Sequence, residues 1–373
     1  MRIANVFRLG IKELRSLARD PIMLTLIVYA FTFGVYAAAT AIPETLNNAP
    51  IAIVDEDRSA LSTRIVSAFY PPSFKPPILI TPREMDARMD AGSITFALDI
   101  PPNFQRDILA GRRPDVQLNV DATRVTQAFT GAGYIQMILT GEVAAFLQRY
   151  RAAPSPSVDL ALRARFNPSL EKSWFGALNE VINHITMLSI ILAGAALIRE
   201  REHGTVEHLL VMPVTPTEIM LSKIWSMALV VLAAAAAALF IVVERLLSVP
   251  IQGSIALFLA AAAVHLFATT SMGIYLATLA RSMPQFALLL MLVIMPLEML
   301  SGGATPRESM PQFVQDVMLV APTTHFIQLA QGVLFRGAGF DVVWPQFIAM
   351  AVIGAVLFGL ALLRFRKTIA EAS

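Results

Sequence analysis

The sequence has no cysteine among its 373 residues, which excludes disulfide bonds, thiolate catalysis and cysteine-based zinc or iron–sulfur sites. It also has no Gly-Lys dipeptide, and a phosphate-binding P-loop requires Gly-Lys followed by Ser or Thr. Neither a His-Glu-x-x-His metal motif nor a Gly-x-Ser-x-Gly nucleophile elbow is present. We therefore expect no enzyme activity, no metal and no cofactor, and any ATP hydrolysis must be carried out by another subunit.

Charged residues are scarce at 15%, whereas 56% of the residues are hydrophobic and the mean hydropathy is +0.62. A chain of this length and composition is too apolar for a soluble domain and predicts membrane spans. The formal net charge of +2 is too small a basic excess to indicate nucleic-acid binding.

Six apolar runs are close to or above the roughly 20 residues that a helix needs to cross about 30 Å of hydrocarbon. They cover residues 21–43, 181–198, 224–243, 254–280, 283–303 and 342–363. A cleaved secretory signal is the alternative for the first run. That run is longer than the usual signal core of about 7–15 residues, so we favour a span.

Residues 1–20 predict an amphipathic helix at the membrane surface. Arg8, Lys12, Arg15 and Arg19 follow one another at spacings of four, three and four, so they share one helix face. The other face carries six apolar residues: Ile3, Val6, Phe7, Ile11, Leu14 and Leu17. A helix with this pattern lies in the membrane interface rather than across the bilayer.

Residues 44–177 predict a water-exposed α/β domain, because charge and proline are spread throughout this region. Four β-rich runs alternate with helical stretches. They are residues 51–54, 78–81, 94–100 and 116–121. Asp55, Glu56 and Asp57 follow the first run, and three consecutive carboxylates cannot all point to one metal ion, so we interpret them as a solvated turn.

The distribution of Lys and Arg predicts the orientation. If the N-terminus lies inside, the short inside segments hold twelve Lys and Arg, whereas the short outside loops hold three. Because basic residues accumulate in short cytoplasmic segments, both termini and residues 199–223 are expected in the cytoplasm, and residues 44–177 outside.

The polar island at residues 199–223 lies between two predicted spans. Pro213 ends any helix before it, and Thr215, Pro216 and Glu218 form a capping box that starts the next helix. The island also carries a pattern of charged, small and apolar residues: Glu200, Arg201, Glu202, Gly204, Thr205, Val206, Glu207, Leu209, Leu210, Pro213 and Lys223. In their order and spacing these residues resemble the cytoplasmic coupling segment of ABC transporter permeases of the type-2 exporter superfamily. The resemblance implies that the segment docks on a separate ATPase subunit.

A second pattern follows the fifth span and is similar to the outer segment of the same family. It consists of Pro296, Leu300, Ser301, Gly302, Pro306, Met310, Pro311, Pro322, His325 and Phe326. The resemblance implies that residues 304–335 form short helices dipping into the outer leaflet, and that spans two and five line the substrate route. Polar residues within the spans are candidates for the route or outer gate: Glu298 and Ser301 in span five, Asn183 in span two and His265 in span four. For Glu298 an interfacial, ion-paired carboxylate is an equal alternative, and for His265 we favour an interhelical hydrogen bond.

We expect a membrane α-helical protein with six transmembrane helices and an α/β external domain inserted between spans one and two. The predicted parts are residues 1–20, 21–43, 44–177 and 178–373. The resemblance implies the permease subunit of an ATP-driven exporter in a bacterial cytoplasmic (inner) membrane, driven by ABC ATPase subunits. Its further partners would be a second copy or a paralogous permease, and a periplasmic adaptor protein. The alternative is a non-transporting six-span scaffold or sensor whose external domain binds a ligand, and the substrate is not specified.

Overall fold

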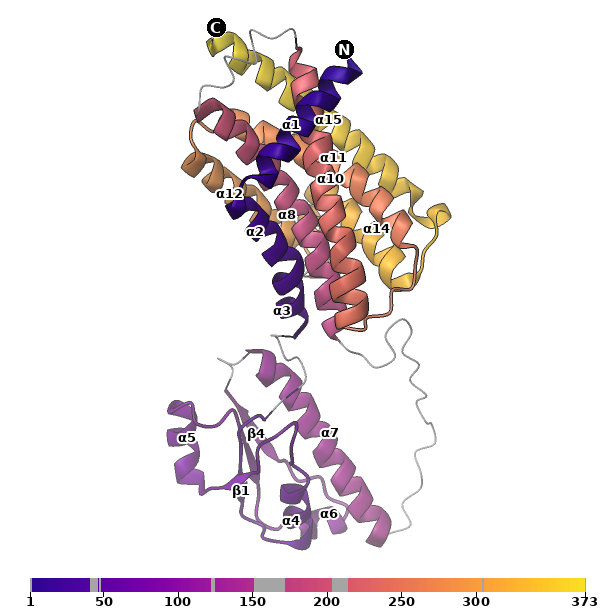
Figure 1. Cartoon of the computed structure of the whole chain (residues 1–373). Coiled ribbons are helices and arrows are strands. Elements are labelled where there is room, and N and C mark those ends of the chain that lie inside the picture. Colours follow the sequence, from indigo (N-terminus) through magenta and orange to yellow (C-terminus); the bar gives the residue numbers. More distant parts are fainter. Residues whose placement is uncertain are drawn as a thin grey trace. The chain divides into compact units, whose positions relative to one another are not determined.

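The computed structural model describes residues 2–40, 46, 48–121, 125–150, 172–202, 214–303 and 305–372. The chain divides into two compact units (Figure 1). The membrane unit comprises Met1–Ala41 and Arg163–Ser373, and the α/β unit comprises Ile42–Leu162.

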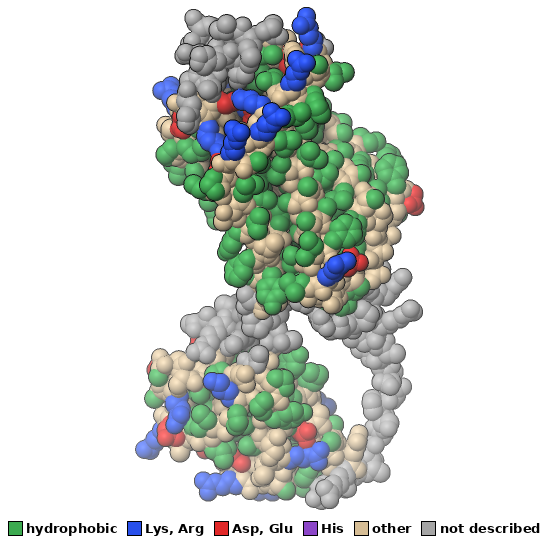
Figure 2. All heavy atoms as spheres, viewed as in Figure 1, with side chains coloured by type: hydrophobic (Ala, Val, Ile, Leu, Met, Phe, Trp, Pro, Cys, Tyr) green, Lys and Arg blue, Asp and Glu red, His purple; other side chains and the backbone are tan. Residues whose placement is uncertain are grey.

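Six helical segments of the membrane unit are long and apolar enough to cross a bilayer, in agreement with the six expected spans. They are Pro21–Thr40, Trp174–Glu202, Pro216–Leu246, Ile255–Leu279, Met283–Leu300 and Phe340–Lys367. In helix labels these are α2 (Pro21–Tyr29) with η1 (Ala30–Gly34) and α3 (Val35–Thr40), α8 (Lys172–Glu202), α10 (Pro216–Ala237) with η2 (Ala238–Leu246), α11 (Ile255–Leu279), α12 (Met283–Leu300) and α15 (Phe340–Ala372). Figure 2 shows hydrophobic side chains covering the visible flank of this unit, as contact with lipid requires.

Helix α8 is the centre of the membrane unit. In its most apolar stretch 83% of the residues are buried, compared with 22% in α12 and 17% in α15. Small residues bring α11 close to it: a Cβ atom added at Gly273 would lie 2.4 Å from the carbonyl oxygen of Ile190. Glycine at this crossing therefore allows the two backbones to touch, as is common between membrane helices.

Two sharp bends flank the spans. Helix α1 (Ile3–Ala18) ends just before α2, where Asp20 is the N-cap and Pro21 the first helical residue. At the other bend, α13 (Gln312–Val317) and η4 (Met318–Val320) meet α14 (Pro322–Arg336) at 96°. Pro322 lacks the amide hydrogen that would continue the preceding helix, so the chain changes direction there.

The α/β unit contains a four-stranded sheet in the order β2-β1-β3-β4. Strand β1 (Ile51–Asp55) pairs in parallel with β2 (Ile78–Leu79) and β3 (Phe96–Ile100), and β3 pairs antiparallel with β4 (Gln117–Val120). The helices of the unit are α4 (Ala60–Ser67), α5 (Pro82–Asp90), α6 (Phe104–Leu109) and α7 (Val125–Tyr150). The alternation of strands and helices expected from the sequence is therefore present.

Two of the three carboxylates at the end of β1, those of Asp55 and Asp57, do more than contact solvent. Asp55 accepts hydrogen bonds from the backbone N–H of Arg58 at 2.8 Å and from the Ser62 hydroxyl at 2.9 Å. Asp57 accepts one from the backbone N–H of Gln105 at 3.0 Å. These aspartates therefore hold the starts of α4 and α6 against the end of β1.

Candidate functional site

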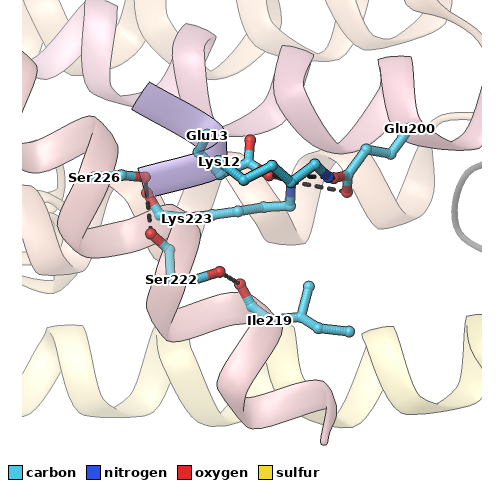
Figure 3. Close-up of polar contacts among 7 residues, drawn as sticks. All are labelled: Lys12, Glu13, Glu200, Ile219, Ser222, Lys223 and Ser226. Atoms are coloured by element: carbon cyan, nitrogen blue, oxygen red, sulfur yellow. Dashed lines mark hydrogen bonds and ion pairs between the residues drawn. The ribbon is translucent and has the colours of Figure 1, made fainter. Parts of the chain in front are cut away.

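Four charged side chains form an ion cluster where α1, α8 and α10 meet, shown in Figure 3: Lys12, Glu13, Glu200 and Lys223. The Lys223 ammonium lies 2.8 Å from the Glu200 carboxylate and 3.1 Å from that of Glu13. Lys12 lies 2.9 Å from Glu200 and 3.7 Å from Glu13. The cluster therefore joins three helices that are far apart in the sequence.

Burial makes this cluster a structural element rather than a surface salt bridge. The side chain of Lys223 is 2% exposed and those of Glu13 and Glu200 are 8% and 11% exposed. Their formal charges, with that of Lys12, cancel, as buried ions require. Burial acts to lower the pKa of Lys12, but Glu200 and Glu13 outweigh it and raise this pKa above its usual value. The ammonium group of Lys12 is therefore held in its charged form by the two carboxylates.

Aromatic packing reinforces the contact between α1 and α10. The Trp225 indole N–H donates a 3.1 Å hydrogen bond to the carbonyl of Val6, and its ring stacks on Phe7 with 5.5 Å between ring centres. A Cβ atom at Gly10 would lie 2.2 Å from the Trp225 ring, so only glycine leaves space for it. Helix α1 thus contacts the protein through a face that includes Gly10 and Glu13.

The last four residues of α8 each contact a different neighbour. Arg199 forms an ion pair with Asp20, the cap of α2. Arg201 donates to the carbonyls of Ala277 at 3.0 Å and Ala280 at 2.9 Å, which complete the C-terminal end of α11. Glu202 accepts a 3.0 Å hydrogen bond from the first backbone N–H of α12, that of Met283, where Ser282 makes no capping bond.

Asp20 remains ionised in this arrangement. Desolvation acts to raise its pKa, but a hydrogen bond from the backbone N–H of Met23 and the ion pair with Arg199 hold the pKa below its usual value. The carboxylate therefore caps α2 and fastens it to α8 at the same time.

Of the residues predicted to couple to an ATPase, the structure places Glu200, Arg201 and Glu202, and all three bind this chain's own helices. The others lie outside the described residues: Gly204, Thr205, Glu207, Leu209, Leu210 and Pro213. The segment resumes at Thr215, whose hydroxyl and Glu218 form the capping box expected at the start of α10. Docking on an ATPase stays a prediction.

In the N-terminal half of α8, polar side chains connect α8 to α11 and α12, and related contacts join α11 and α12 to α14. We call this group the polar layer. The Nε2 atom of His265 lies 2.8 Å from the Thr186 hydroxyl, so the expected interhelical hydrogen bond is present. The Ser301 and Thr323 hydroxyls lie 2.6 Å apart. The His265 ring also stacks on Phe326 with 4.2 Å between ring centres.

The same layer extends to Glu298 through a residue that the sequence analysis missed. Glu180 on α8 lies close enough to Glu298 for their charges to interact, and it accepts a hydrogen bond from Asn183. It also lies 3.3 Å from the Nε2 atom of His184, one helical turn away. The spacing of Glu180, Asn183 and His184 on one helix face could have indicated this group.

Asn183 therefore lies on α8 itself, and His265 and Glu298 meet α8 through Thr186 and Glu180. Ser301 instead contacts Thr323 of α14. Within the described ranges, no group of three or more His, Asp or Glu side chains could hold a metal ion. The layer offers hydrogen-bond donors, acceptors and carboxylates in an apolar setting, which suits the binding of a polar or cationic group.

Comparisons with known proteins agree over nearly the whole chain. A family model described as ABC-2 family transporter protein matches residues 22–363. The chain is 63% identical over 367 residues to "Inner membrane transport permease YhhJ" of Escherichia coli (strain K12), covering 98% of each chain. It is 27% identical over 362 residues to "Probable multidrug ABC transporter permease YbhR" of the same organism, covering 96% of this chain and 97% of the relative.

A family match of this extent, together with six candidate spans, defines the class of protein. The match to the inner-membrane relative extends over 98% of each chain, so it is not limited to one of the two units. The chain therefore belongs to the ABC-2 family of transporters, as a multi-pass inner-membrane permease subunit and not an enzyme.

Proposed function

We propose that this chain is the membrane subunit of an ATP-driven exporter that moves its substrate outward across the inner membrane. The ABC-2 family implies an ABC ATPase partner, and the chain has no P-loop of its own. The excess of twelve Lys and Arg over three supports cytoplasmic termini and an α/β unit on the opposite side. A second permease, either a copy or a paralogue, completes the transporter, and the α/β unit is available to a periplasmic adaptor.

The observation that carries this proposal is the set of contacts at the end of α8. The segment that resembles an ATPase-binding element, residues 199–223, begins with side chains that contact α1, α2, α10, α11 and α12, and residues 203–213 follow them in the sequence. They precede the capped start of α10. A movement of the ATPase against this segment would therefore bias several spans at once between two arrangements.

The route for the substrate lies, in this proposal, along α8 and α12. Glu298 and Glu180 form its charged part, and the Ser301–Thr323 contact lies close by on α12 and α14. Both carboxylates are half-buried within membrane spans, where a charged side chain is costly, which favours a role in the transport of polar substrates over a purely structural one. The name of the relative YbhR makes drug-like compounds the first class to test.

The decisive experiment alters residues 203–213 in the intact transporter. Glu207→Arg would set like charges against each other at a docked surface, and Leu210→Asp would bury an unpaired charge there, so each should weaken ATPase binding by several kcal/mol. Co-purification of the ATPase and substrate-stimulated ATP hydrolysis measure this. Glu56→Arg, an exposed charge reversal in the α/β unit, is the matched control. If Glu207→Arg and Leu210→Asp both retain wild-type ATPase association and wild-type stimulation of ATP hydrolysis, the segment is only a connector.

A further inference from the structure

The bend between α1 and α2 contains a cavity of about 700 Å³ whose lining carries four basic side chains and one acidic one. The basic ones are Lys12, Arg15, Arg19 and Arg199, and Asp20 and Ser16 lie beside them. We infer that this cavity binds the phosphate headgroup of an anionic phospholipid. This inference goes beyond the proposed function and depends on neither the direction of transport nor the ATPase.

Two of the four basic side chains around the cavity form ion pairs with carboxylates, and the other two do not within the described residues. Arg199 is paired with Asp20, and Lys12 lies 2.9 Å from Glu200 in the ion cluster. Arg15 and Arg19 are exposed and form no ion pair in the part of the chain that the structure describes. Two guanidinium groups therefore border the cavity without an ion-pair partner among the described residues. Arginine binds phosphate oxygens in a bidentate manner, and the Ser16 hydroxyl offers a further donor.

The position of the cavity favours a lipid as the source of the phosphate. It lies where the first candidate span begins at Pro21, which places it at a membrane–water boundary in either orientation of the chain. The next turn of α2 exposes apolar side chains, with Ile22 76% and Leu24 39% exposed. Figure 2 shows the same juxtaposition, Lys and Arg gathered over α1 with hydrophobic side chains immediately below.

A phospholipid matches both halves of this surface. Its headgroup would contact Arg15 and Arg19 while its acyl chains lie against Ile22 and Leu24. A free phosphate would leave the apolar half unused. An acidic protein surface could pair with the arginines, but it would not contact Ile22 and Leu24, which belong to the candidate span.

The test measures lipid binding to the purified full-length chain in detergent by native mass spectrometry. The probes are cardiolipin and phosphatidylglycerol, with phosphatidylethanolamine of the same acyl composition as the neutral reference. Arg15→Ala with Arg19→Ala should weaken anionic-lipid binding by about 10- to 30-fold, the effect of two interfacial charges. Arg15→Lys with Arg19→Lys should retain most of the binding because the charge remains.

The control is Arg8→Ala with Arg366→Ala, which removes two exposed charges outside the cavity. It should leave binding nearly unchanged. An equal loss in this control would show diffuse surface attraction, and wild-type binding by the cavity variant would show that lipid binds elsewhere. If millimolar inorganic phosphate displaces the bound anionic lipid as effectively as added lipid does, the cavity is a site for free phosphate. Loss of ATPase co-purification with unchanged lipid binding would assign it to a protein partner. Each of these four results overturns the inference.

Discussion

Replacing Lys223 with methionine removes the most buried charge of the ion cluster while nearly preserving side-chain volume. In the folded protein this ammonium lies between Glu200 at 2.8 Å and Glu13 at 3.1 Å. After the substitution, two carboxylates that are 11% and 8% exposed share one cation, the half-exposed Lys12. The cluster then carries a net charge of −1 in a largely desolvated setting.

Breaking a buried ion pair by removing one partner typically destabilises a protein by about 3–5 kcal/mol. We expect a value near the lower limit, about 3 kcal/mol, because Lys12 still contacts both carboxylates and is reached by water. A second substitution, Glu200→Gln, returns the net charge of the cluster to zero. The double variant should therefore be more stable than the sum of the two single losses predicts, with a coupling energy of about 1–3 kcal/mol.

Chemical unfolding of the purified protein in detergent measures these losses. Lys75→Met is the control, because Lys75 is an exposed lysine of the α/β unit. Two results together would refute the reasoning: a midpoint for Lys223→Met equal to that of the control, and strictly additive losses in the double variant. The charges would then be solvated by water or lipid headgroups and would not hold α1 against α8 and α10.

Three further predictions follow from the site and the orientation. Glu298→Gln should lower the export rate by about tenfold, equivalent to ~1.4 kcal/mol, in a vesicle assay at equal expression, and unchanged export would reduce Glu298 to an interfacial carboxylate. In this cysteine-free chain, Ser67→Cys should react with an impermeant thiol reagent in intact cells and Ala4→Cys only after permeabilisation; the reverse pattern would invert the topology. Thr215→Ala should destabilise the start of α10 by about 0.5–2 kcal/mol, and full retention of stability would show that the capping box is dispensable.

Features that repeat at short range were predictable from the sequence. The six spans are continuous apolar runs, and the strands of the α/β unit alternate with helices along the sequence. The capping box at Thr215 likewise depends on a residue three positions away, Glu218, and it is present. At these places local propensity and burial favour the same secondary structure, so it can be predicted from a single sequence.

Contacts between distant residues were not predictable. The basic face of α1 was correctly placed, but the sequence offered no reason to turn Glu13 inward, because its partner Lys223 is 210 residues away. Glu180 was missed for a similar reason, since its interaction with Glu298 on α12 arises only when α8 and α12 come together. Charge pairing across helices depends on tertiary packing, which hydrophobic periodicity does not encode.

The run Arg199-Glu200-Arg201-Glu202 shows how a charged helix end, which is usually solvated, can instead connect several helices. Successive residues of an α-helix are about 100° apart around its axis, so four in a row point in nearly every direction. At the end of α8 these directions meet α2, then α1 with α10, then α11, and then α12. Under the proposed function, this run opens the ATPase-binding segment, residues 199–223. A displacement of that segment would therefore be shared among these five helices, because no single bond at the end of α8 can yield without straining the others.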